Sequence, residues 1–285
     1  MKKNHELINI FLITIILLYL LCNTTNLNNY IIFATKLWFY KVFPFLFTMI
    51  ILNNLLISNN ILYYLNKIFK KNGIKYYVLI MSLLSGSPTN TLIIKELYNK
   101  QIINKKDADK LLLFTHFSNP IFLISMLSSL FTKKIVIKLI IIHYIPNIII
   151  SFFIKINPNK QDIIIKKDNF NTILNKALNT SLMVLGTLVF YILISNIVID
   201  IFNLNNIYRA LFKGLLEITQ GLNEITNLNI NTKLKTILTV SFLNLGGLSI
   251  HSQTKSIISD TSISYKYFLL GRIIQLLLGV FINNI

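Results

Sequence analysis

A polar stretch rich in hydrogen-bonding groups interrupts an apolar region in the first third of the chain. Pro88 removes a backbone donor and Gly86 loosens the chain, so we expect a helix to break there. The break would expose hydroxyl and freed backbone groups, which suit an anionic or heteroaromatic ligand. An ordinary membrane span over residues 74–98, kinked at Pro88, is the alternative. The candidate ligand-binding residues of this stretch are Ser85, Gly86, Ser87, Pro88, Thr89 and Asn90.

A second interruption follows the apolar run Thr236–Leu245. It places glycines and hydroxyl groups between that apolar arm and a short apolar return at Ile257 and Ile258. Paired interruptions in two halves of a membrane protein are typical of transporter binding sites. Capping and close packing of helices are the alternative for both breaks, because small residues let helices approach closely. The candidate ligand-binding residues here are Gly246, Gly247, Ser249, His251 and Gln253.

Glu217 is the one acid that we place well inside an apolar segment, the short span Ile207–Leu222. A carboxylate within a membrane is costly and usually functional. We expect Glu217, together with Thr219, to hold a coupling proton or cation, or to pair with a donor of the substrate. The alternative is a salt bridge with one of the cations Arg209, Lys213 and Arg272.

Other polar residues in or near apolar segments receive lesser roles. Asn119, next to Pro120, is expected to break its own span and to contribute amide contacts to a ligand. We interpret His116 and His143 as packing or interfacial residues and leave both outside the site. Lysines inside a span snorkel towards the interface, and we expect this of Lys36 and Lys41. The aspartates in basic connectors are interpreted as solvated: Asp107, Asp109, Asp162 and Asp168.

The composition places these residues in a membrane protein. Of 285 residues, 54% are hydrophobic and only 13% are charged, and the mean hydropathy is +0.62. A soluble domain cannot bury so much apolar side chain, so the predicted fold class is an all-α polytopic membrane protein. The net charge of +18 comes from lysines in short connectors, where they indicate topology and contacts with anionic lipid rather than nucleic acid. A single cysteine, Cys22, excludes a disulfide within the chain and offers no metal cluster.

Runs of apolar residues predict the helices that must position the two polar breaks. A first span after Lys2 and Lys3 is expected to be retained, with its N-terminus inside. Residues 57–68 form an amphipathic segment, interpreted as an interfacial helix or, alternatively, a crossing. The predicted spans are Leu7–Leu21, Tyr30–Leu52, Ala108–Leu130, Ile135–Ile154, Ala177–Ile201, the short Ile207–Leu222 and Tyr265–Phe281.

The order of element, break and span occurs twice along the chain. We therefore predict a single transmembrane domain over residues 1–285 with two structural repeats, each containing a broken helix or re-entrant hairpin. The gate-like repeats cover residues 31–130 and 207–283, and the break at 85–90 is matched with the break at 246–253. Whether the repeats are parallel or inverted depends on whether residues 57–68 cross the membrane, and both arrangements stay open.

Four stretches, in matching order, resemble the YlbJ (SpoVV) family of sporulation integral membrane proteins. They are Ser85-Gly86-Ser87-Pro88-Thr89-Asn90, Phe117-Ser118-Asn119-Pro120, residues 216–222, and residues 241–253. The resemblance runs from about Lys36 to Phe281. It implies nucleoside-recognition "gate" domains similar to concentrative nucleoside transporters, and transport of dipicolinic acid from mother cell to forespore across the outer forespore membrane. The chain is shorter than the family pattern, and Asn244 and Leu245 loosen the expected Ser-Phe-Gly-Gly sequence.

Transport is the leading functional hypothesis, with no cofactor and no enzymatic activity expected. The expected partners are a small anionic substrate and the lipid bilayer, and an oligomer is possible; nucleosides or other carboxylates are alternative substrates. A second hypothesis is an intramembrane hydrolase, since Ser249 lies near His251, but no acid or oxyanion motif accompanies them. A third is an assembly partner in spore formation that transports nothing.

Overall fold

The computed structural model describes residues 2–158 and 167–284, and its regular secondary structure is helical throughout this described part. Four helical stretches are long and apolar enough to cross a membrane. The first, Thr24–Ser58, joins α2 (Thr24–Leu37), a π-helical turn η1 (Trp38–Val42) and α3 (Phe43–Ser58). The others are α9 (Lys133–Phe153), α10 (Phe170–Phe202) and α15 (Tyr265–Asn284). The predicted all-α membrane fold class is confirmed.

The surface of the long helices suits contact with lipid. Large apolar side chains such as Phe153, Phe190 and Leu277 are more than half exposed, and a hydrocarbon environment accepts them without the usual cost. The N-terminal helix α1 (Lys2–Cys22) contributes the apolar stretch Ile13–Cys22, which is shorter than the four candidate spans.

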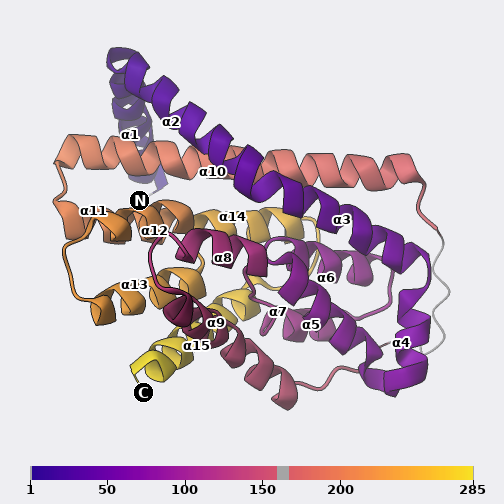
Figure 1. Cartoon of the computed structure of the whole chain (residues 1–285). Helices are drawn as coiled ribbons and strands as arrows, with labels where there is room; N and C mark the ends of the chain where they lie inside the picture. Colours follow the sequence, from indigo (N-terminus) through magenta and orange to yellow (C-terminus); the bar gives the residue numbers. More distant parts are fainter. Residues whose placement is uncertain (1, 159–166, 285) are drawn as a thin grey trace.

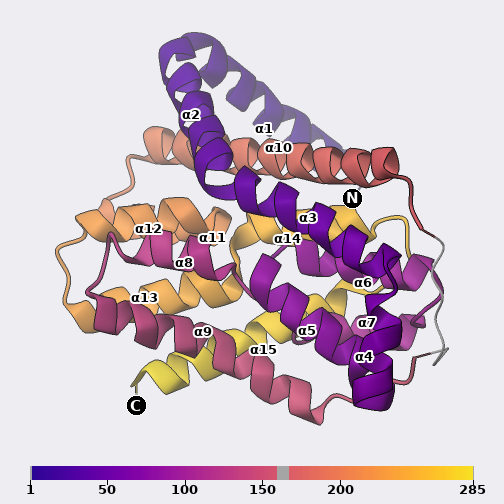
Figure 2. The ribbon, with the colours of Figure 1, turned by 45° about the vertical axis from the view of Figure 1, so that its right-hand side comes forward.

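Short helices fill the space between the long ones. In Figure 1, α10 runs along the upper edge with α2 and α3 crossing it, while α9 and α15 lie below. Figure 2 shows the same order after rotation, with the short helices between these two layers. The short helices before α9 are α4 (Ile61–Phe69), η2 (Lys70–Asn72), α5 (Gly73–Ser85), α6 (Thr89–Asn99), α7 (Lys105–Leu112) and α8 (Pro120–Leu127). Those after α10 are α11 (Asn206–Leu216), α12 (Ile218–Asn227), α13 (Thr232–Leu245) and α14 (Gly247–Ile258).

The predicted break after Ser85 is present because Gly86 adopts a left-handed backbone conformation, with φ of 74°. A Cβ on Gly86 would lie 2.6 Å from the backbone nitrogen of Asn119, so the α5–α6 turn approaches the α7–α8 connection closely. The Asn119 side chain joins the two: its amide donates to Leu84 O at 2.6 Å, and its carbonyl caps α8 by accepting from Ile121 N at 2.9 Å.

The predicted break at residues 246–253 is confined to its first residue. Gly246 ends α13 with φ of 91°, and α14 already begins at Gly247. Residues 247–253 are therefore helical, and their side chains project from the first turns of α14 rather than from a loop.

Two segments predicted as spans are interrupted. The segment 108–130 is broken at the position where Asn119 and Pro120 were expected to break it, but the gap is longer, because α7 already ends at Leu112 and α8 begins at Pro120. The short span predicted at 207–222 is wrong, because α11 ends at Leu216 and Glu217 caps the start of a new helix, α12. A capping carboxylate that accepts backbone N–H groups explains this second break without glycine or proline.

Two further predictions need correction. For the segment 57–68, which is divided between the end of α3 and α4, only the alternative of a membrane crossing is wrong, because α4 has 9 residues, about 14 Å, too few to cross a membrane. Asp107 and Asp109 are buried rather than solvated: Asp107 accepts from Asn157 N at 3.1 Å, and Asp109 accepts from Ser264 N at 2.7 Å. These carboxylates fix connectors by satisfying their backbone donors. Asp162 lies outside the described residues.

Candidate functional site

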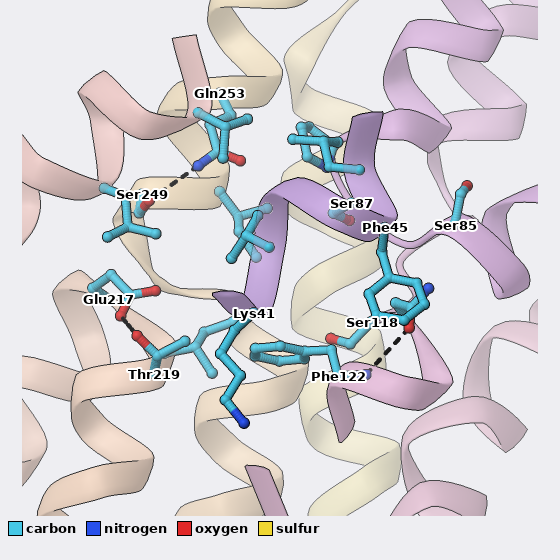
Figure 3. Close-up of a pocket in the computed structure, with 18 of the residues that line it drawn as sticks. Lys41, Phe45, Ser85, Ser87, Ser118, Phe122, Glu217, Thr219, Ser249 and Gln253 are labelled. Carbon is cyan, nitrogen blue, oxygen red and sulfur yellow. Dashed lines mark hydrogen bonds between the residues drawn. The ribbon is translucent and has the colours of Figure 1, made fainter. Parts of the chain in front are cut away.

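One cavity lies where the α5–α6, α7–α8 and α11–α12 breaks meet the first turns of α14 (Figure 3). Its volume is about 90 Å³, several times the roughly 10–15 Å³ that a single water requires. Its polar or charged lining residues are Lys41, Ser85, Ser87, Ser118, Asn119, Glu217, Thr219, Ser249 and Gln253. The remaining lining residues are Val42, Phe45, Leu46, Pro88, Phe117, Phe122, Val184, Leu188, Ile218 and Ile250. Segments up to about 200 residues apart in sequence therefore form one mixed polar and apolar site.

The α5–α6 break contributes Ser85, Ser87 and Pro88 to the cavity. The Ser85 hydroxyl donates back to Met81 O at 2.5 Å, whereas the Ser87 hydroxyl accepts from Arg272 Nη2 at 3.2 Å. The Ser87 backbone N–H donates to Phe117 O at 2.9 Å, which ties this break to the α7–α8 connection. Of these serines, Ser87 keeps its hydroxyl hydrogen available for a ligand.

Glu217 and Thr219 enter the cavity from the α11–α12 break, as Figure 3 shows. The Thr219 hydroxyl donates to the Glu217 carboxylate, which also accepts from Gln220 N at 3.0 Å. No salt bridge joins Glu217 to any cation in the described part of the chain. The salt-bridge alternative considered from sequence is therefore wrong, and the carboxylate is buried but held only by neutral donors.

Ser249 and Gln253 reach the cavity from α14, one helical turn apart. Gln253 Nε2 donates to Ser249 Oγ at 3.2 Å and to Thr187 Oγ1 of α10 at 3.0 Å. Figure 3 shows this pair on the same side of the cavity as Glu217. The amide of Gln253 is thus positioned by α10, while its carbonyl oxygen and the Ser249 hydroxyl remain available to a ligand.

Several predicted site residues do not line the cavity but shape its walls. The Asn90 side chain is fully buried and donates to Thr115 O at 2.7 Å, so it connects α6 to the α7–α8 connection. His251 contacts Tyr265 OH at 2.5 Å and Leu245 O at 2.8 Å. The other predicted residues outside the lining are Gly86, Thr89, Gly246 and Gly247. These positions support the breaks that carry the lining residues.

Lys41 is exposed and lines the cavity at one margin, so its position is compatible with the predicted snorkelling. It belongs to η1, a π-helical turn, and its amine donates to Ser125 Oγ of α8 at 2.7 Å. Figure 3 shows the amine directed away from Ser249 and Gln253, towards one margin of the site. The π-helical turn and the nearby Pro44 are typical of irregular functional segments, but the apolar context alone predicted snorkelling.

A network of neutral polar side chains lies next to the cavity and is bonded to one of its lining residues, Ser118. The Nε2 atom of His143 accepts from Ser118 N at 2.9 Å, and its Nδ1 atom lies 2.7 Å from Asn244 Oδ1. This pairing is satisfied by a neutral ring protonated on Nδ1. Asn244 also donates to Gln275 O at 3.0 Å, which connects α9, α13 and α15. His143 and His116 are both buried, so both pack inside the protein and neither lies at the membrane interface.

The chain is similar to a protein whose name describes a sporulation integral membrane protein. It is 22% identical, over an alignment of 295 residues, to sporulation integral membrane protein YlbJ of Bacillus subtilis (strain 168). The alignment covers 84% of this chain and 72% of that protein. No protein-family model matches the chain. No solved structure matches it either. The similarity extends over most of the chain and supports the resemblance to this family of sporulation membrane proteins. It does not show a nucleoside-recognition domain.

Proposed function

We propose that the protein is a membrane transporter that moves a small anion, of the dipicolinic acid type, during spore formation. The observation that carries this proposal is a cavity assembled from breaks in helix pairs far apart in sequence. Non-helical backbone at membrane depth is tolerated where it is buried in protein or lines a cavity, and transporters use it for binding.

The polarity of the helix ends favours an anionic ligand. Many polar lining residues lie at the starts of helices: Asn119 caps α8, Glu217 caps α12, and Ser249 lies in the first turn of α14. Helix N-termini carry partial positive charge. Phe45, Phe117 and Phe122 add an apolar, aromatic wall suited to a planar ring. A planar aromatic dicarboxylate meets both conditions, and a nucleoside meets the second.

The element order supports a two-repeat architecture. Each half has two pairs of short helices followed by one long helix: α5–α6, α7–α8 and α9, then α11–α12, α13–α14 and α15. In Figures 1 and 2, α5–α6 and α11–α12 lie towards opposite ends of the molecule. This pairing matches α5–α6 with α11–α12, instead of matching the breaks at 85–90 and 246–253.

Glu217 is the proposed coupling residue. It is the single acid among the cavity-lining residues, and the donors that hold it are neutral. A proton or cation at this carboxylate would offset its repulsion of an anionic substrate in the same cavity. Coupling of this kind requires no enzymatic step. Ser249 is bonded to Gln253, and both nitrogens of His251 bond to other groups, which disfavours the hydrolase hypothesis.

The relative's name connects it to sporulation and to a membrane, and we extend both to this chain. The proposed location is the outer forespore membrane, across which a mother-cell product reaches the forespore. Flux measurements test the proposal: the full chain is reconstituted in vesicles, and uptake of labelled dipicolinate and of labelled uridine is followed with and without a proton gradient. We expect saturable dipicolinate uptake. Saturable uptake of uridine alone would favour the nucleoside alternative, and no uptake of either would favour an assembly role.

A further inference from the structure

Arg272, on α15, is a buried cation without an acidic partner. Its side chain is fully buried, and none of the salt bridges among the described residues involves it. An unpaired charge away from water is costly and persists only where other interactions offset it. Glu217, the acid that lines the adjoining cavity, forms no ion pair with Arg272, so the positive charge of the guanidinium must be offset by other groups.

The compensation visible in the protein is weak and neutral. Arg272 Nη1 lies 3.4 Å from Leu243 O and 3.4 Å from Asn244 O, at the C-terminus of α13, and 3.5 Å from the neutral Gln275 Oε1 on α15. The guanidinium also lies over the Phe268 ring, 5.3 Å from its centroid. A helix C-terminus carries only about half a negative charge, and a ring face carries a quadrupole rather than a charge. Most of the positive charge is therefore uncompensated.

Arg272 reaches the cavity through one hydroxyl group. Its Nη2 atom donates to Ser87 Oγ at 3.2 Å, and Ser87 lines the cavity although Arg272 does not. A guanidinium has donors only, so Ser87 must accept from it. Within the described part of the chain no other hydrogen bond of the Ser87 hydroxyl is present, which leaves its hydrogen free to point into the cavity. A donor polarised by a cation behind it makes stronger hydrogen bonds.

We propose that Arg272 is a positioning residue that makes the cavity select anions, acting on a ligand carboxylate through the Ser87 hydroxyl. The ligand class is a small carboxylate, and the missing counter-charge of Arg272 is the ligand itself. This inference rests on the proposed transport of a small anion and deepens it, because it names the residue that distinguishes an anion from a neutral ligand of the same shape.

The competing role for Arg272 is structural. Its contacts with the last carbonyls of α13 resemble a C-terminal cap, and Gly246 lies against its guanidinium. A cap would affect all ligands equally, because it would act on the shape of the cavity. Charge acting through Ser87 would instead affect anions alone, so the ratio of anion binding to neutral binding separates the two roles.

The test measures equilibrium binding to the full-length protein in detergent, with dipicolinate as the anion and pyridine-2,6-dicarboxamide as its neutral counterpart. Variants are Arg272→Gln, Arg272→Lys, Ser87→Ala and the double change Arg272→Gln with Ser87→Ala. Lys255→Gln is the matched control, because Lys255 is an exposed cation on α14 and its loss changes the net charge equally. Ser87→Ala removes the relay without touching the contacts of Arg272 with α13.

We expect Arg272→Gln to weaken dipicolinate binding about tenfold or more, the size of a lost charge-assisted hydrogen bond. The affinity for the diamide should change by less than about twofold. Ser87→Ala should produce a comparable loss, the double variant should lose little more than either single variant, and Arg272→Lys should retain part of the preference. Lys255→Gln should leave both affinities unchanged.

Equal losses for both ligands in Arg272→Gln and Arg272→Lys would overturn the inference and assign Arg272 to capping. Unchanged dipicolinate binding in Ser87→Ala would also overturn it, and this variant decides the matter if Arg272→Gln does not fold. A wild-type protein that binds neither ligand would instead refute the proposed function, and the inference would fall with it. The two failures are thus distinguished by the wild-type measurement.

Discussion

Lys213 and Glu224 form an ion pair, with Nζ and Oε1 2.6 Å apart, that joins the two helices of the α11–α12 pair. The pair is only slightly exposed. The basic member of this ion pair, Lys213, is the cation nearest in sequence to Glu217. Glu217 itself lies between the two helices and accepts hydrogen bonds from neutral groups. The pair therefore holds the two helices together, while the acid at their junction stays available to a ligand or a coupling ion.

Glu217→Gln is expected to impair transport while preserving the amount of protein in the membrane. Glutamine keeps the shape and can still accept from Thr219 and Gln220, but it cannot hold a proton or cation in exchange with the substrate. We expect gradient-driven dipicolinate uptake to fall about tenfold, equivalent to ~1.4 kcal/mol. Uptake in vesicles and membrane accumulation by immunoblot are measured together.

Glu224→Gln is the matched control for this change, since it makes the same substitution in the same helix pair. It breaks the ion pair with Lys213 and should lower thermal stability with little loss of uptake per folded molecule. If Glu217→Gln reduces protein and uptake in equal proportion, Glu217 is a structural residue and the coupling role is wrong.

Gly86→Ala tests the left-handed turn between α5 and α6. A side chain at φ of 74° is strained, and the added Cβ would lie 2.6 Å from Asn119 N, a backbone atom that cannot move freely. We expect a loss of stability of about 2 kcal/mol or more, measured as thermal denaturation in detergent. Gly186→Ala on α10 is the control: a Cβ there meets no neighbour within 4 Å. It should stabilise by about 0.5–1 kcal/mol, and equal behaviour of the two variants would contradict the model of a tight turn.

The sequence predicted those features that local chemistry determines. Gly86 with Pro88 and Gly246 with Gly247 mark helix breaks, because these residue types disfavour continuous helix, and both breaks are present. The α7–α8 break was predicted from Asn119 and Pro120, but its length, which extends back to the end of α7 at Leu112, was not predicted. The residues before Asn119 are largely apolar, so their hydropathy resembles that of a spanning helix.

The remaining features depend on contacts between distant parts of the chain. Glu217 ends one helix and starts another because its carboxylate binds the backbone of α12, and no glycine or proline marks the position. Lys41 lines the cavity because α2–η1–α3 crosses near α8. Arg272 lies beside Ser87 although 185 residues separate them. Sequence spacing carries no information on such pairs.

Asn244→Ala tests the network behind the cavity. Asn244 departs from the Ser-Phe-Gly-Gly pattern that the family resemblance implies. Its side chain lies between three helices and is bonded to His143 and to Gln275 O. Alanine would leave the His143 N–H and the Gln275 carbonyl without this partner in a buried site, which costs about 1–3 kcal/mol. Thermal denaturation in detergent should show the loss, whereas Asn223→Ala, at an exposed position on α12, should change stability by less than about 0.5 kcal/mol. Similar melting of both variants would remove the structural role of the network.

Asp168 gives a pH-dependent prediction outside the membrane-spanning segments. Burial raises the pKa of its carboxyl, but the ammonium groups of Lys176, at 2.9 Å, and Lys100, at 3.3 Å, lower it by more, so the pKa lies below its ordinary value of 3.8. Because the folded-state pKa is the lower one, the ionised group stabilises the fold above about pH 4, and this stabilisation is lost as the pH falls through the folded-state pKa. The carboxylate connects the segment before α10 to α6.

Asp168→Asn should therefore lower the melting temperature at pH 7 by about 2 °C, corresponding to ~1 kcal/mol for a partly buried pair. The difference from wild type should begin to shrink below about pH 4, where the unfolded carboxyl takes up a proton, and should vanish only below the lowered folded-state pKa, where the folded carboxyl is neutral as well. Asp260→Asn is the comparison, since its pair with Lys95 is largely exposed on the Asp260 side and should contribute less. Melting curves recorded in detergent from about pH 7 to about pH 2 measure both differences, because this range extends well below the ordinary pKa of an aspartate. A constant offset between wild type and Asp168→Asn across this range would show that the asparagine acts through packing, and the charge pairing of Asp168 with Lys100 and Lys176 would then contribute nothing measurable.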